Sequence, residues 1–322
     1  AASDVYKSQD YEGKATGVSF IDKEENQEYK LKGKVVVLAA SACSSARILL
    51  NSKSKQHPNG LANSSDLVGK YLHDSTGGDM MAFIPQLINR KTYNEDGVGG
   101  MHVYSPWWLD NKNLDFARGY HIEQWGGLGA PTYGTGFDVN SFNKFFGINK
   151  AGGYGNVLRS DMKKYYGSTI GLSGRGESIA QKTNYCEIDP NKVDKYGVPV
   201  LRFNYQWTDN EIKQAKHMQD TFEEIIHNMG GISLWEKPGK ENNYGLTKPG
   251  QIIHEVGTTR MGSNPKDSVV NEYEKLHDTS NVYVVDAGPF VSQADKNPTW
   301  TILALAMRSS EKIVEEFKKQ NF

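Results

Sequence analysis

The chain has 322 residues, a formal net charge of −1 and 11% aromatic residues, among them 17 Tyr and 6 Trp. This length corresponds to about two domains, and the near-neutral charge gives no electrostatic case for binding nucleic acid or an anionic membrane surface. No apolar run approaches the roughly 20 residues of a membrane-spanning helix, and the two cysteines, Cys43 and Cys186, allow at most one disulfide.

The N-terminal region predicts a hairpin followed by a buried strand and a helix. Residues 13–21 alternate loosely between apolar and polar side chains, and residues 29–31 return after a polar turn, as in an antiparallel hairpin. The β-branched run at 34–40 predicts a strand buried on both faces of a parallel sheet. Small residues then lead into a helix over 44–51, and they would let a ligand approach the backbone of this turn closely.

The central region predicts an antiparallel sheet. Residues 52–79 are rich in loop-forming residues, and from about 80 to 245 short aromatic strands alternate with glycine-rich loops. The aromatic residues there, including Trp107 and Trp108, suit either a sugar-binding wall or ordinary core packing. Residues 126–156 contain many Gly, Tyr and Asn, which predicts a long loop or lid.

Two elements of the central region are predicted in more detail. Residues 184–190 and 197–203 form a pair of strands across a polar turn. Thr208 and Glu211 make a capping box ahead of an apolar stripe that ends at Gly230, which predicts a long helix.

Metal-site and hydrolase patterns are absent from the sequence. His217 and His227 are ten residues apart, not four, and no HExxH, HxxxH or CxxC pattern occurs. No catalytic metal is therefore expected. No GxSxG sequence occurs either, which argues against an α/β-hydrolase.

The C-terminal region contains the strongest candidate site. Residues 282–285 predict a buried strand that ends in Asp286. Asn297 is predicted as the N-cap, and Pro298 as the first residue, of a long helix whose N-terminus suits an electron-rich ligand. His254 and Asn297 stand at the edges of these elements. The residues of this helix that recur at helical spacing and are expected to pack inward are Leu303, Ala306, Met307, Ser310, Ile313, Val314 and Phe317.

Three motifs in this region are HEVGTTRMG (residues 254–262), NVYVVDAG (281–288) and KNPTWTI (296–302). They resemble, in order and spacing, the C-terminal motifs of the glucose-methanol-choline (GMC) oxidoreductases, which are FAD-dependent alcohol and sugar dehydrogenases and oxidases. The resemblance implies that His254 and Asn297 are catalytic and face the flavin and the substrate hydroxyl. The cofactor-binding residues that it implies are Ala40, Ser41, Asp286, Ala287, Asn297, Pro298 and Thr299. The segment VGKYLHD (68–74) is similar to a segment beside the flavin, so His73 is a further candidate, either in the site or as a structural residue.

The resemblance also implies a mixed α/β fold, with an incomplete Rossmann-like FAD-binding domain and an antiparallel-sheet substrate domain with helices. Residues 1–79 and 246–322 are expected to form the FAD-binding part, and residues 80–245 the substrate domain. No strand–GxGxxG–helix unit occurs in the sequence. The chain is therefore expected to lack the family's N-terminal pyrophosphate-binding segment and to hold FAD only weakly by itself.

The implied reaction is oxidation of a CH–OH group of a sugar or glycoside, with hydride transfer to flavin N5 and His254 as the base. If His254 is not the base, His73 and His121 are the next candidates. The sequence most resembles bacterial sugar dehydrogenases, including glucoside 3-dehydrogenases, which implies a cytochrome or small subunit as electron acceptor and a periplasmic location. Two alternatives stay open. One is a non-catalytic, carbohydrate-binding remnant or subunit of a GMC-like protein, and the other is an unrelated α/β enzyme such as a hydrolase.

Overall fold

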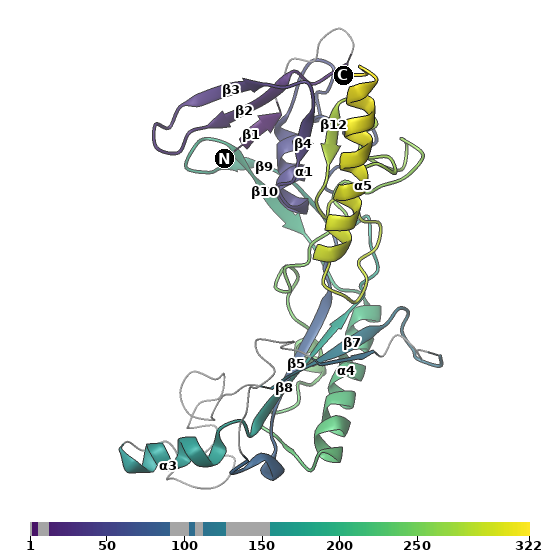
Figure 1. Cartoon of the computed structure of the whole chain (residues 1–322). Helices are drawn as coiled ribbons and strands as arrows, with labels where there is room; N and C mark the ends of the chain where they lie inside the picture. Colours follow the sequence, from purple (N-terminus) through teal and green to yellow (C-terminus); the bar gives the residue numbers. More distant parts are fainter. Residues whose placement is uncertain (1, 6–12, 91–102, 107–111, 127–154) are drawn as a thin grey trace. The chain divides into compact units, whose positions relative to one another are not determined.

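The computed structural model describes residues 2–5, 13–90, 103–106, 112–126 and 155–322 (Figure 1). The chain divides into two compact units. Unit 1 comprises Ala1–Ser75, Ser178–Gln206 and Pro249–Phe322, and unit 2 comprises Thr76–Glu177 and Trp207–Lys248. Helices are combined with parallel and antiparallel sheets, which confirms the predicted mixed α/β class.

Unit 1 is built around a two-stranded parallel sheet. Strand β4 (Val36–Leu38) pairs with β12 (Val282–Val284), and one face of this pair packs with α1 (Ala42–Asn51) in an apolar core. The prediction of a strand buried on both faces is wrong for β4, because Val37 is 49% exposed. Tyr283, its partner in register on β12, is buried. The face of β4 that carries Val37 is therefore only partly covered by the part of the chain that the structure describes.

Two antiparallel arrangements complete the sheets of unit 1. Strands β1 (Ala2–Val5), β2 (Gly17–Ile21) and β3 (Glu28–Lys32) form a three-stranded sheet in that order, which confirms the first predicted hairpin. Strands β9 (Tyr185–Val193) and β10 (Pro199–Asn204) form the second predicted hairpin. Arg47 on α1 forms an ion pair of 2.8 Å with Asp194 in this hairpin. This contact helps to explain why residues 178–206 belong to unit 1, whereas the expected division placed them in the substrate domain.

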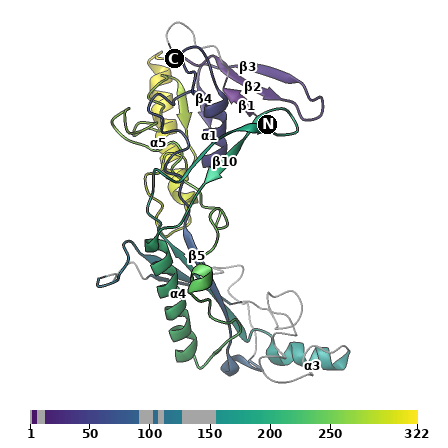
Figure 2. The same ribbon diagram turned by 180° about the vertical axis from the view of Figure 1, so that it is seen from behind.

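The long C-terminal helix α5 (Thr299–Lys318) runs along β12 in both views (Figures 1 and 2). The expectation that its stripe of apolar residues packs inward is wrong for most of the stripe, although Ala306 and Ile313 are half-buried. Ser309 is its one buried residue, whereas Leu303, Met307, Val314 and Phe317 are 56%, 64%, 51% and 55% exposed. The half-buried side is instead the one that carries Ile302, Leu305, Ser309 and Ile313. Apolar residues lie on both sides of this helix, so the spacing alone could not identify the inner one.

Unit 2 is a five-stranded antiparallel sheet with the order β11-β5-β8-β7-β6. Its strands are β5 (Thr76–Phe83), β6 (Val103–Pro106), β7 (Tyr120–Gly126), β8 (Thr169–Gly176) and β11 (Ile232–Ser233). The shorter helical elements are η1 (Pro85–Leu87), α3 (Asn156–Tyr165) and η3 (Lys240–Gly245). Helix α4 (Asp209–Asn228) lies on one face of the sheet (Figure 2) and begins with the predicted capping box of Thr208 and Glu211. Met218 and Phe222 of α4 pack in one core with residues of β5, β7 and β8.

Some predictions concern residues outside the described ranges. Trp107, Trp108 and most of the predicted loop or lid at 126–156 lie there. Among the described residues, no helix combines the length and the apolar character that crossing a bilayer requires.

Candidate active site

The carboxyl ends of β4 and β12 bring Ala40 and Ser41 next to Asp286. Asp286 is 6% exposed, and its Oδ2 accepts a hydrogen bond from Ser45 Oγ at 2.5 Å while its Oδ1 accepts one from the Gly288 N–H at 2.8 Å. Burial raises the pKa of Asp286, and hydrogen bonds from Ser45 and from backbone N–H groups, including those of Ala40 and Ser41, oppose that rise. Asp286 thus organises the turn at the strand ends, the edge where α/β sheets bind ligands.

The turn after β4 presents its backbone to the outside. Ala40 and Ser41 are both exposed, and Ser41 has a φ of 84°, which few non-glycine residues adopt. Such conformations are costly and often occur where a ligand contacts the backbone. Ser41 directly precedes α1, so the unpaired N–H groups of the first turn of α1 begin at this place. These features fit the predicted contact of Ala40 and Ser41 with a nucleotide cofactor.

Two of the three motifs lie side by side through backbone hydrogen bonds. The bonds run from Gly257 N to Ala287 O (3.2 Å), from Thr259 N to Gly288 O (2.9 Å) and from Met261 N to Pro289 O (2.8 Å). A Cβ atom on Gly288 would lie 2.3 Å from Thr259 Oγ1, so glycine is required for this close approach. The pairing places the segment that follows His254 beside the segment that follows Asp286.

A path of hydrogen bonds joins His254 to the residue before Asn297. His254 is half-buried, and its Nδ1 lies 3.2 Å from Ser75 Oγ. Gln293 Nε2 donates to the same Ser75 Oγ at 3.4 Å and to the carbonyl oxygen of Lys296 at 3.1 Å. The first and third motifs are therefore connected through two buried side chains, Ser75 and Gln293.

Asp74 holds the backbone of this path. Its Oδ1 accepts hydrogen bonds from the N–H groups of His254 at 3.0 Å and Ser75 at 2.8 Å. Burial raises the pKa of Asp74 to about 6, and the nearby charge of Glu255 adds to the rise, while the hydrogen bonds from the two N–H groups oppose it. A buried carboxyl in this position stabilises the geometry of His254 through its main chain.

Several buried polar atoms around the path have no partner among the described residues: Asp74 Oδ2, Gln293 Oε1, Thr259 Oγ1 and His73 Nε2. Buried polar groups in proteins are nearly always paired, and unpaired ones mark places where a ligand or ordered water completes the pairing. Together with the exposed turn at Ala40 and Ser41, they fit a polar ligand such as FAD.

Asn297 is exposed, and its predicted role as N-cap is wrong. Helix α5 begins at Thr299, so Pro298 occupies the cap position, and no side chain makes a cap hydrogen bond there. Asn297 lies one residue before this cap position, and its side chain makes no hydrogen bond to the first turn of α5. Its amide is therefore not engaged in holding the helix.

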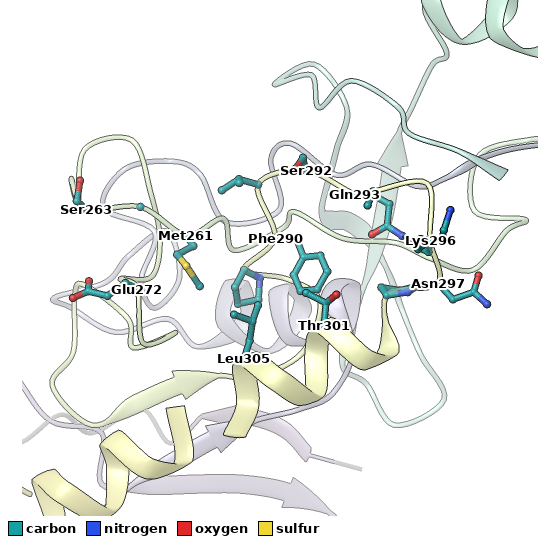
Figure 3. A pocket seen from close by; sticks show the side chains of 15 residues that line it. Met261, Ser263, Glu272, Phe290, Ser292, Gln293, Lys296, Asn297, Thr301 and Leu305 are labelled. Carbon is teal, nitrogen blue, oxygen red and sulfur yellow. Dashed lines mark hydrogen bonds between the residues drawn. The ribbon is translucent and has the colours of Figure 1, made fainter. Parts of the chain in front are cut away.

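Asn297 lines one end of a cavity of about 720 Å³ at the start of α5. Figure 3 shows Phe290, Thr301 and Leu305 grouped in its middle, with Lys296 and Asn297 at one end. Most of the lining residues come from residues 289–298 and from the first two turns of α5. The cavity is thus formed by the segment that also carries the predicted flavin-facing residues.

The other candidate histidines have structural partners. His73 is fully buried, its Nδ1–H donates to the Tyr71 carbonyl oxygen at 2.7 Å, and burial lowers its pKa to about 4. It is therefore neutral near pH 7. His121, in unit 2, is fully buried with Nε2 3.1 Å from Glu123 Oε1.

Sequence reasoning missed Asp74, Ser75 and Gln293. Asp74 ends the VGKYLHD segment, in which the family resemblance points to His73 and not to Asp74. Gln293 carries no local signal, because its role depends on Ser75, which is 218 residues away in the chain. No group of three or more His, Cys, Asp or Glu side chains in the described part of the chain is arranged to hold a metal ion.

Comparison with known proteins supports the reading of the motifs. Residues 181–306 match the family model described as GMC oxidoreductase. The chain is 30% identical over 306 residues to 2-methyl-1,2-propanediol dehydrogenase of Mycolicibacterium austroafricanum, covering 95% of this chain and 52% of the relative. It is 24% identical over 312 residues to the fructose dehydrogenase large subunit of Gluconobacter japonicus, covering 96% of this chain and 52% of the relative. The chain thus spans about half the length of these relatives.

Solved structures show the same fold. A formate oxidase of Aspergillus oryzae superposes with a TM-score of 0.64 at 13% identity, covering 96% of this chain and 59% of that one. A pyridoxine 4-oxidase from Mesorbium loti gives a TM-score of 0.64 at 13% identity, with 97% and 56% covered. The resemblance predicted from the motifs is confirmed: residues 181–306 match the C-terminal domain of the GMC oxidoreductases, a family whose cofactor is FAD.

Proposed function

We propose that the protein containing this chain oxidises a CH–OH group of a sugar or a related polyol, with FAD as hydride acceptor. The observation that carries the proposal is the hydrogen-bonded path from His254 through Ser75 and Gln293 to Lys296, since it orients an imidazole beside the segment that bears Asn297. The names of the relatives, including fructose dehydrogenase and gluconate 2-dehydrogenase, support a substrate rich in hydroxyl groups.

The proposed cofactor site uses the two surfaces described above. FAD, when bound, supplies flavin N5 as the hydride acceptor. The exposed turn after β4 is suited to the nucleotide half, and the positive end of α5 is suited to the electron-rich ring system. The residues proposed to hold the cofactor are Ala40, Ser41, Asp286, Ala287, Asn297, Pro298 and Thr299.

His254 is proposed as the base that removes the hydroxyl proton. A neutral imidazole is suited to this step near pH 7, because its unperturbed pKa is about 6.5. In the tautomer whose Nδ1–H donates to Ser75 Oγ, Nε2 carries the lone pair that takes the proton. Ser75 and Gln293 then act as positioning residues, since they set the ring orientation and the tautomer.

Asn297 is proposed to hold the substrate oxygen. Its amide offers both donors and an acceptor, and it has no capping role. Holding the oxygen while His254 takes the proton leaves the carbon-bound hydrogen free to transfer as hydride.

The test is anaerobic stopped-flow reduction of the flavin-loaded protein by fructose, gluconate, pyranosides and a 1,2-diol. The variant His254→Ala should reduce its flavin about 10²–10⁴-fold more slowly while its FAD affinity, measured by titration, stays the same. His227→Ala, which changes an exposed histidine on α4, is the matched control and should behave as the parent. Unchanged reduction in His254→Ala would show that another group is the base.

A second measurement separates positioning from direct catalysis. Ser75→Ala removes the partner of His254 Nδ1, and we expect about a tenfold slower reduction together with a shifted pH profile. A purely structural role of Ser75 would change stability but not the pH profile. A protein that binds sugars yet reduces no flavin with any substrate in the panel would instead support the non-catalytic alternative.

The electron acceptor and the location are further parts of the proposal. A cytochrome or small subunit as acceptor is supported by the name of the fructose dehydrogenase relative, which is a large subunit. Oxidation at position 3 of a glucoside is supported by the C-glycoside 3-oxidase of Arthrobacter globiformis, which matches 47% of this chain at 29% identity. A periplasmic location rests on the family resemblance alone.

A further inference from the structure

Two free thiols meet inside unit 1. Cys43 lies in the first turn of α1 and is half-buried, whereas Cys186 lies on β9 and is 1% exposed. Cys186 belongs to the apolar core of this unit, and Cys43 packs against the same core. They are the only cysteines of the chain, and the fold brings them together from segments that are far apart in the sequence.

The face of α1 that carries Cys43 lies against the β9–β10 hairpin. Arg47, one helical turn after Cys43, donates to Asp194 at 2.8 Å and to the carbonyl oxygen of Pro199 at 2.7 Å. Asn51, one turn further, donates to the same carbonyl oxygen at 3.2 Å. Residues four apart lie on one face of a helix. Cys43 is therefore the first residue of a row of side chains that faces this hairpin.

Strand β9 presents Cys186 to its buried face. Successive side chains of a strand point to opposite faces, and the next residue, Glu187, pairs with Arg202 of β10 at 2.7 Å on the outer face. A Cβ atom on Gly69 would lie 3.4 Å from Cys186 Sγ, so the backbone closely covers one side of this thiol. On another side, the thiol of Cys43 makes a hydrogen bond with that of Cys186. The two sulfur atoms are thus direct neighbours.

The same contact makes Cys43 a poor nucleophile in the folded chain. The hydrogen bond with Cys186 is the largest cause that raises the pKa of Cys43, and burial and nearby negative charges, among them Glu255 and Asp286, add to the rise. The thiolate is the form that attacks a disulfide. Exchange in the folded chain is therefore slow, so a bond between the two sulfurs would form while the chain folds.

We propose that Cys43 and Cys186 form a disulfide that fastens the start of α1 to β9 when the protein folds in contact with a disulfide oxidant such as oxidised glutathione. One cysteine thiolate displaces a first glutathione from the oxidant and forms a mixed disulfide. The other cysteine then attacks the bound protein sulfur and displaces the second glutathione. The two cysteines lose two electrons and two protons, and the oxidant is reduced to two thiols.

The bond would restrain the turn that precedes α1. Cys43 follows Ser41 by two residues, and Ser45 in the same turn of the helix donates to Asp286 at 2.5 Å. A link from Cys43 to β9 holds this turn from a further side. The effect on cofactor contact rests on the proposed function, whereas the bond itself does not, so it is tested without any activity measurement.

The test compares protein folded in a glutathione redox buffer with protein folded in a reductant. After free thiols are blocked, trypsin cleaves after Lys and Arg and releases peptides 35–47 and 183–192, each with one cysteine. We expect these peptides to be joined in the oxidised sample and to separate on reduction. Separate peptides, a cysteine joined to glutathione, or a link between two chains would contradict the proposal.

A stability measurement shows whether the bond fits the native packing. We expect the equilibrium constant for unfolding to be about 100-fold smaller in the oxidised protein, because the link restricts the unfolded chain. An unchanged or larger constant would show that the bond distorts the fold and would overturn the proposal. In Cys186→Ala, which cannot form the bond, the two buffers should give equal stability. A gain that persists in this variant would show that the buffer causes it.

The matched control is the double variant Cys43→Ser and Ser44→Cys, which moves the thiol to the next position of α1, where Ser44 is exposed. One residue corresponds to a rotation of about 100° around the helix, so this thiol no longer faces the hairpin. We expect no link with Cys186 in this variant. Equal linkage would show that two thiols pair by chance in the unfolded chain, and it would contradict a bond directed by the fold.

Discussion

Helices α4 and α5 have the same length of 20 residues and similar apolar spacing, but they differ in what they bury. Helix α4 buries eight residues against the sheet of unit 2, whereas α5 buries only Ser309. The N-terminus of α4 has a complete capping box, and that of α5 has no side-chain cap. An amphipathic pattern therefore shows that a helix has an apolar side, but burial depends on whether the chain supplies a layer to cover that side.

The largest expected difference between the two helices is in core truncation. Phe222→Ala on α4 should lower the free energy of unfolding by about 3–5 kcal/mol, because Phe222 is fully buried and the substitution leaves a cavity. Met307→Ala on α5 should change it by less than about 0.5 kcal/mol, because the side chain is 64% exposed. Chemical denaturation of the chain measures both. Equal losses would show that α5 is covered in solution.

A smaller effect concerns the one buried contact of α5. Glu274 accepts the hydrogen bond of Ser309 and is fully buried. Burial raises the pKa of Glu274 to about 7. The hydrogen bond from Ser309 and the charge of Arg308 oppose this rise, and the charge of Asp286 adds to it. Glu274 binds its proton more tightly in the folded state than in the unfolded state. The free energy of unfolding therefore falls as pH rises from about 4.5 to about 7.

Glu274→Gln removes this titration. It should therefore stabilise the chain at pH 8 by on the order of 2 kcal/mol, with the gain disappearing below about pH 5. Thermal or chemical unfolding at several pH values measures this. Glu272→Gln, at an exposed position two residues earlier, is the control and should show little pH-dependent gain. A gain that persists at pH 4 would contradict the assignment to Glu274.

The smallest expected effect compares the two helix starts. Thr208→Ala should cost about 1 kcal/mol, because the Thr208 side chain caps α4. Asn297→Ala should change stability by less than about 0.5 kcal/mol, because Asn297 does not cap α5. Any loss of flavin reduction in Asn297→Ala then reflects its proposed contact with the substrate. A stability loss of 1 kcal/mol or more in this variant would restore the capping role.

Local sequence was sufficient where one segment contains the whole interaction. The capping box of Thr208 and Glu211, the hairpins and the VYV strand were predictable because their partners lie within a few residues or follow a short-range pattern. The three motifs also predicted the family, because their order and spacing are visible in one dimension.

The tertiary structure alone placed Ser75 and Gln293 beside His254. These contacts join residues about 180 and 220 positions apart in the chain, and no periodicity reports on such pairs. The same holds for Asp286 and Ser45, whose hydrogen bond spans 241 positions.

The sequence by itself determined which residue types stand at the candidate site and that α5 is a long helix with apolar residues. Only the tertiary structure decided which side of α5 is covered and which face of strand β4 is exposed at Val37. The physical reason is that apolar spacing records the tendency of a side chain to leave water, whereas burial also requires a second surface to meet it. For α4 that surface lies within residues 1–322, whereas Leu303 and Met307 of α5 stay more than half exposed.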